Sequence, residues 1–185
     1  FKRWAELDAK AEDFRRTVGF GRAETEGVQR AAVQSWEDFK RFGVGLEQAF
    51  GSATALVGQF GVLNMATREN VAQLALMERN LGVAHEHGAG ALDIFTQMGD
   101  GTADSARNMM NVTISMSKAA GVPLDKVMSD IAGASDEVQM FLGRSAEEMI
   151  RTAVHARRLG TDMNKLASTA KGFLDFESSI NAEME

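Results

Sequence analysis

Apolar residues recur every three or four positions through most of this chain. The first such stripe ends at two closely spaced glycines, Gly19 and Gly21. Its members are Trp4, Leu7, Ala11, Phe14 and Val18. Because this spacing places the side chains on one face of a helix, the pattern predicts an amphipathic first helix.

A longer stripe follows between residues 39 and 63, where the steps alternate between three and four. Its members are Phe39, Phe42, Leu46, Ala49, Ala53, Leu56, Phe60 and Leu63. A heptad pattern of this length is typical of coiled coils, and Asn70 would continue it as a polar seam residue. Helical bundles share the same spacing. The five glycines between residues 43 and 61 favour a bundle, because each costs about 1 kcal/mol relative to alanine inside a helix. The pattern alone leaves both interpretations open.

The rest of the sequence predicts shorter helices, each bounded by capping or turn residues. They are expected over residues 68–81, 91–98 and 102–120 and in further segments beyond. Across the chain, the expected N-terminal caps are Thr25, Thr102, Ser135, Ser145 and Thr161. We therefore expect an all-α fold, with long N-terminal helices of coiled-coil character followed by a compact array of short helices. The expected division is residues 1–67 and residues 68–185, the second part ending in a helix that continues beyond the fragment.

A short internal repeat is also present. "GVPLDKVMS" at 121–129 and "GTDMNKLAS" at 160–168 share glycine, a large apolar residue, lysine, an aliphatic residue and serine in the same order. The two stretches indicate either two similar helix–turn–helix units or one solution, used twice, for ending a helix and starting another.

Composition narrows the functional classes. The chain has 185 residues, of which 44% are hydrophobic and 25% charged, with a net charge of −6. This balance is ordinary for a globular protein, and the acidic charge weighs against general nucleic-acid binding. Because the chain has no cysteine, disulfides and thiolate zinc sites are excluded.

The sequence contains no recognisable catalytic constellation, so we expect a protein that is not an enzyme and has no cofactor or metal. His85 and His87 lie too close together for a zinc-protease motif, which needs both histidines on one helix face. We expect these two histidines and His155 to be solvated.

The sequence leaves two other functions to consider besides a structural one. Residues 48–67 carry no charge over about the length of a membrane span, although six polar side chains dilute them, so a membrane-active segment that aids DNA entry is the alternative. "SKAAGVPLDKV" is similar to the turn of a DNA-binding helix-turn-helix. Asp125 and Asp130 in the second helix would repel phosphates, and we therefore expect no sequence-specific nucleic acid binding.

Two C-terminal stretches, "KAAGVPLDKVMSDIA" and "AVHARRLGTDMNKLASTAKGFLDFESSINAEME", resemble a recurring segment of phage tail tape measure proteins. The resemblance covers residues 105–185 well and the upstream part loosely, and "LDFESSINAEME" at 174–185 is its most specific part. No catalytic motif comes with it. It implies a long, mostly helical virion protein that occupies the tail lumen, sets tail length during assembly in the host cytoplasm, and leaves with the DNA during genome ejection.

The stripes and the resemblance give two sets of candidate residues. Self-association, with a trimer favoured by the resemblance, is expected through Phe39, Phe42, Leu46, Leu56, Phe60 and Leu63. Packing onto a tail tube, hub or tip protein is expected through Phe173, Phe176, Ile180 and Met184. The last four share a helix face that is still unfinished where the chain stops, so we expect the chain to be an excerpt of a longer protein.

Overall fold

Helices joined by short turns make up the described part of the chain. The computed structural model describes residues 2–99, 101–141 and 145–172, and these residues contain no strand. The all-α prediction is therefore confirmed for them. The helices are α1 (Lys2–Val18), α2 (Arg22–Phe39), η1 (Lys40–Phe42), α3 (Leu46–Phe60), η2 (Leu63–Met65), α4 (Arg68–Leu81), α5 (His85–Met98), α6 (Ala103–Ala120), α7 (Leu124–Ala132), α8 (Asp136–Phe141) and α9 (Ala146–Arg158). Residues 163–172 are also helical.

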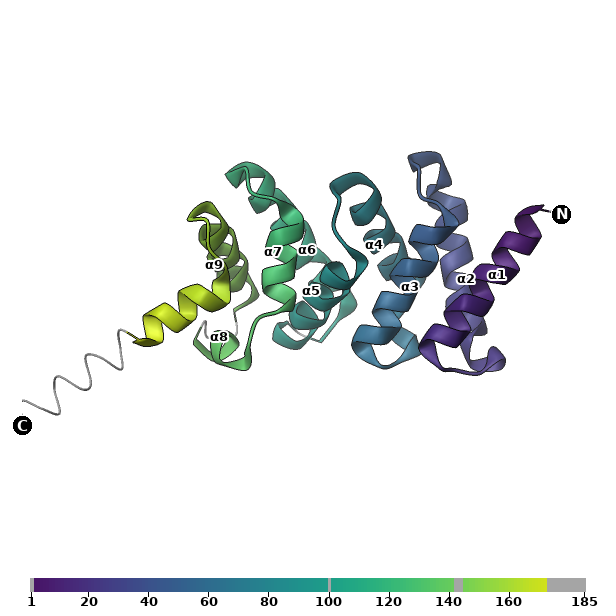
Figure 1. The fold of residues 1–185 in the computed structure, drawn as a ribbon, viewed down its shortest axis with the longest axis horizontal. Coiled ribbons are helices and arrows are strands. Elements are labelled where there is room, and N and C mark those ends of the chain that lie inside the picture. Colours follow the sequence, from purple (N-terminus) through teal and green to yellow (C-terminus); the bar gives the residue numbers. More distant parts are fainter. Residues whose placement is uncertain (1, 100, 142–144, 173–185) are drawn as a thin grey trace, which may run out of the picture.

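The helices stack side by side into an elongated molecule, with α1 and the helix at 163–172 at opposite ends (Figure 1). The main contacts join helices that are next or next but one in chain order, with the short α8 skipped. One layer contains α1, α3, α5 and α7, each of which contacts the next. The other layer contains α2, α4, α6 and α9, with contacts of α2 with α4 and of α6 with α9. This quasi-one-dimensional arrangement is that of a helical solenoid.

A 39-residue repeat underlies the stack. Gly43, Gly82, Gly121 and Gly160 are each 39 residues apart (82 − 43, 121 − 82 and 160 − 121), and their φ angles are 85°, 67°, 68° and 75°. Each follows the end of a helix and takes the left-handed conformation, which glycine adopts without a steric cost. These four turns lie along the upper edge of the molecule in Figure 1. The short repeat in the sequence is therefore part of a longer series of helix–turn–helix units, which we define as residues 43–81, 82–120 and 121–159.

The hydrophobic core follows the same period. One set of fully buried residues at 39-residue intervals lies on the second helices of the units and on α2: Ala32, Val71, Met110 and Met149. A second buried set at the same interval lies on the other layer: Phe14, Ala53, Leu92 and Ile131. Each unit thus buries one face against its neighbours, and one continuous core runs along the stack.

The heptad stripe at 39–63 is divided between helices. It spans the end of α2, η1, α3 and η2, because Gly43 and Gly61 both take positive φ angles that end a helix. The longest named helices, α2 and α6, have 18 residues. Coiled-coil character is therefore not shown in the described chain; successive helices that each bury one face give the same spacing. The boundary expected at residue 67 falls where α4 packs against α2 and α3, and it stays a prediction.

Most of the predicted helix starts agree with the structure. Thr102 and Ser145 accept hydrogen bonds from the backbone N–H groups of Ser105 and Glu148. Two caps were predicted wrongly. α2 begins at Arg22 with Gly21 as its cap, so Thr25 lies inside the helix, and Asp162, rather than Thr161, accepts from the Lys165 N–H at 2.9 Å. The helix expected at 91–98 begins earlier, at His85, because the glycines in its first turns lie inside a close contact with neighbouring helices.

Candidate interaction surface

Polar contacts join successive units at the first turns of their helices. Asp125 of α7 accepts a hydrogen bond from the Ala84 N–H at 3.0 Å, and its Oδ1 lies 2.7 Å from Nδ1 of His87. Partial burial alone would raise the pKa of Asp125, but the bonds from Ala84 and His87 hold that pKa below its ordinary value. A charged Asp125 therefore ties the start of α7 to the start of α5.

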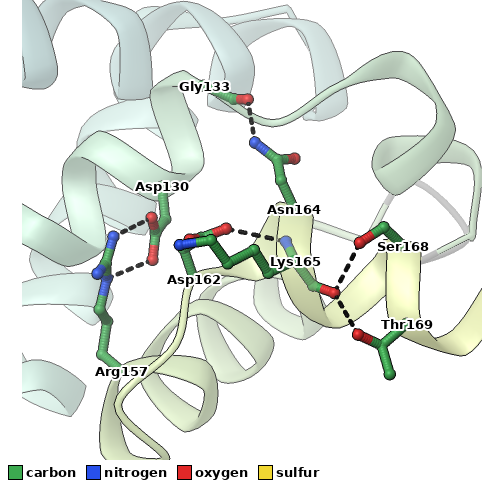
Figure 2. Close-up of polar contacts among 8 residues, drawn as sticks. All are labelled: Asp130, Gly133, Arg157, Asp162, Asn164, Lys165, Ser168 and Thr169. Atoms are coloured by element: carbon green, nitrogen blue, oxygen red, sulfur yellow. Dashed lines mark hydrogen bonds and ion pairs between the residues drawn. The ribbon is translucent and has the colours of Figure 1, made fainter.

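A buried ion pair joins α7 to α9 within the last complete unit. Arg157 donates from Nε to Asp130 Oδ2 at 2.6 Å, and its second nitrogen donates to Oδ1 (Figure 2). Asp130 is 7% exposed. Burial raises the pKa of Asp130 above its ordinary value despite Arg157. The pair is thus a bidentate contact that holds the two helices in one relative position.

The helix at 163–172 docks on the turn after α7. The Asn164 side chain donates to the Gly133 carbonyl at 2.9 Å and accepts from the Ser135 N–H at 3.4 Å. Figure 2 draws this Asn164–Gly133 contact together with the Asp130–Arg157 pair. Asp162 accepts from the Lys165 N–H, and this bond and the Lys165 ammonium hold the pKa of Asp162 below its ordinary value. Side-chain contacts with the backbone therefore hold the start of the helix at 163–172 against the C-terminal end of α7.

A hollow of about 670 Å³ opens between α4 and α6, with Phe39 at its rim. Arg107 crosses it and donates to Asn70 Oδ1 at 2.8 Å, while the Asn70 amide donates to the Met65 carbonyl at 2.9 Å. Arg68 on the same wall pairs with Asp38. The predicted seam residue Asn70 is fully buried and connects helices of one chain.

The six residues expected to mediate self-association do not form one surface. Leu46 and Leu56 are buried in the core, so this stripe is largely explained by folding of the chain itself. Phe39, Phe60 and Leu63 are partly buried. Phe42 is 52% exposed. Self-association stays a prediction, and in the folded chain Leu46 and Leu56 are not available to a second copy.

The other expected surfaces fall differently. Phe173, Phe176, Ile180 and Met184 lie outside the described residues, so their packing onto a partner stays a prediction. Residues 48–67 form most of α3 and then a turn and η2, and membrane activity of this segment stays a prediction as well. The turn that is similar to a DNA-binding motif is one of the four repeated turns, and α7 packs against α5.

The expectation of solvated histidines is wrong for two of the three. Nδ1 of His85 lies 3.1 Å from the Ser52 hydroxyl and Nε2 lies 3.5 Å from Glu78, while His87 contacts Asp125. His155 is exposed. The contacts of His85 with Ser52 and of His87 with Asp125 could not be read from local spacing, because these partners lie 33 and 38 residues away. The 39-residue spacing of the turn glycines was the signal that would have placed these helices side by side.

Searches for other kinds of site and for similar proteins gave no match. No three acidic or histidine side chains gather into a metal-binding cluster within the described ranges. No helix there is both long enough and apolar enough to cross a membrane. No family model, no curated protein and no solved structure matches the chain.

Proposed function

We propose that the chain is a segment of a phage tail tape measure protein, a structural virion component that sets tail length and docks on tail hub or tip proteins. The observation that carries the proposal is the open series of 39-residue units, stacked in one direction. The resemblance of residues 105–185 to such proteins is the reason for proposing this family in particular.

A unit series is a physically suitable length standard, because in such a stack length is added in equal increments. Each unit contacts its neighbours, and stability and length are then both approximately sums over units. The increment depends on the form that the chain takes in the tail. A unit of 39 residues in one straight helix would add about 58 Å, whereas a stacked unit would add roughly 10 Å, the distance between packed helices.

The polar groups of the described chain also favour a structural role. Asp125, His87, Asp130 and Arg157 all contact groups on neighbouring helices. They position helices and leave no arrangement of an acid, a base and a nucleophile around a cavity.

The test is an in-frame deletion of residues 82–120 from the gene that encodes the parent protein, with tail length measured by electron microscopy. The matched control is a duplication of the same unit. We expect shorter tails from the deletion and longer tails from the duplication, by about 58 Å for an extended helix or roughly 10 Å for a stacked unit. Peptides of this chain should also be found in purified virions. Unchanged tail length in both variants, or particles without the peptides, would contradict the proposal.

A further inference from the structure

Exposed apolar side chains gather on the two long edges of the stack. Among the described residues, five large apolar side chains are exposed, and three of them immediately precede the repeated glycines. These three are Phe42, Leu81 and Leu159, with 52%, 45% and 66% exposure. All three therefore lie on the edge formed by the four left-handed turns, the upper edge in Figure 1. We call this row the turn edge.

The turn itself does not need these apolar side chains. A helix that ends in a left-handed glycine is normally closed by an apolar residue after the glycine, which packs back on the helix. Val44 and Val83 fill that place, at 2% and 1% exposure, and the Val44 N–H bonds back to the Phe39 carbonyl. The residue before the glycine could therefore be polar without loss of the turn, yet Phe42, Leu81 and Leu159 are apolar.

Charged residues flank the turn edge on both sides. The helices of one layer end in exposed cations at the same 39-residue interval, namely Lys40, Arg79 and Lys118. The helices of the other layer begin with acidic residues: Glu47 and Glu86 are exposed, whereas Asp125 already contacts Ala84 and His87 within the chain. Helix dipoles account for the sign at each end. The result is a strip with an apolar centre, a basic flank on one side and an acidic flank on the other.

We propose that the turn edge binds the turn edge of a second copy of this chain, in a parallel and in-register dimer whose two-fold axis runs along the stack. A rotation about that axis exchanges the flanks, so the cations of one copy face the carboxylates of the other. Each unit faces its counterpart, and the spacing matches because both copies share the same repeat. A two-fold axis across the strip would instead place cations opposite cations.

The strength of this contact depends on the number of units. One turn offers at most a single exposed apolar side chain and one pair of exposed charges, which is far below the area of a stable interface. Once one unit is in contact, the next units bind at a high effective concentration. The affinity of the dimer should therefore rise steeply with each added unit. This proposal does not depend on any role in a phage tail.

The first experiment is sedimentation equilibrium of the chain at a series of concentrations. The edge variant is F42S/L81S/L159S, and the matched control is V62S/M140S, which removes the two exposed apolar side chains outside the turn edge. We expect a dimer that the edge variant weakens at least about tenfold, with an unchanged melting temperature, and that the control leaves intact. A monomer at the highest soluble concentration, a trimer, or a dimer lost in the control alone would overturn the proposal.

Charge exchange tests the direction of the axis. K40E/R79E makes both flanks acidic and E47K/E86K makes both flanks basic, so each variant alone should dissociate and an equimolar mixture should form a heterodimer. If K40E/R79E alone dimerises as tightly as the unchanged chain, the cations of one copy do not face the carboxylates of the other and the parallel arrangement is wrong.

Discussion

Arg157 of α9 donates two parallel hydrogen bonds to Asp130 of α7, and the carboxylate at the centre of this contact is almost completely buried. The two helices come from opposite layers of the same unit, and both pack against α6 as well. The pair therefore fixes the geometry on which the docking of residues 163–172 depends.

Arg157→Ala should destabilise the chain by about 3 kcal/mol at neutral pH, because it leaves a buried carboxylate without a partner. Burial already raises the pKa of Asp130, so acidification should protonate the orphaned carboxyl and reduce the deficit. Urea unfolding followed by circular dichroism at neutral and acidic pH measures both effects. Arg151→Ala, at an exposed position of α9 that pairs only with Glu147 on the surface, should change stability by less than about 0.5 kcal/mol. Equal losses in the two variants would mean that the pair contributes nothing.

Asp125→Asn should flatten the loss of stability in acid. The hydrogen bonds from Ala84 and His87 outweigh burial and lower the pKa of Asp125 in the folded chain. A carboxyl with a lowered folded pKa contributes stability above its unfolded pKa, about 3.9, and loses it as the pH falls through the folded value. Stability measured from neutral pH downward should therefore fall less steeply in the variant. Exposed Asp13, changed to asparagine, is the control, and parallel curves for all three proteins would refute this role for Asp125.

Two glycine-to-alanine changes should have opposite signs. Gly58 lies exposed in α3 with open space around its Cα, so Gly58→Ala should stabilise the chain by up to about 1 kcal/mol. A Cβ at Gly90 would lie 2.6 Å from the Cβ of Ala132, so Gly90→Ala should force α5 and α7 apart and cost about 1–3 kcal/mol. Thermal unfolding of both variants gives the answer. A stabilised Gly90→Ala variant would show that this contact yields easily.

These residues also show how far sequence reasoning reaches. The helix ends were predictable, because Thr102, Ser145, Gly82 and Gly121 act through bonds to residues a few positions away. The arrangement of the helices was not predictable. Heptad spacing indicates that a helix buries one face, but it does not show whether the covering helix belongs to the same chain.

The side-chain contacts between helices were still less predictable from the sequence. Asp125 and Asp130 look like exposed acids on a short helix, and only the stacking of α7 on α5 and α9 reveals their partners. The repeat carried that information, because residues 39 positions apart occupy equivalent places in neighbouring units, but two matching stretches were too few to distinguish a repeat from a recurring turn.

Deletion of residues 82–120 should leave a shorter protein that still folds, because it joins Leu81 directly to Gly121 and so replaces one left-handed turn by its counterpart. In the deleted chain Met149 takes the core place of Met110, and Ile131 that of Leu92, all of which are fully buried in the intact chain. The side chains differ in shape, and the contact of Ser52 with His85 is lost, so we expect lower stability with helical content per residue and cooperative unfolding retained. Deletion of residues 82–111 is the control, since it removes part of α6 and breaks the period. Circular dichroism and urea unfolding of the two proteins decide the matter: if both are disordered, or both fold equally well, the 39-residue unit is not the building block of this chain.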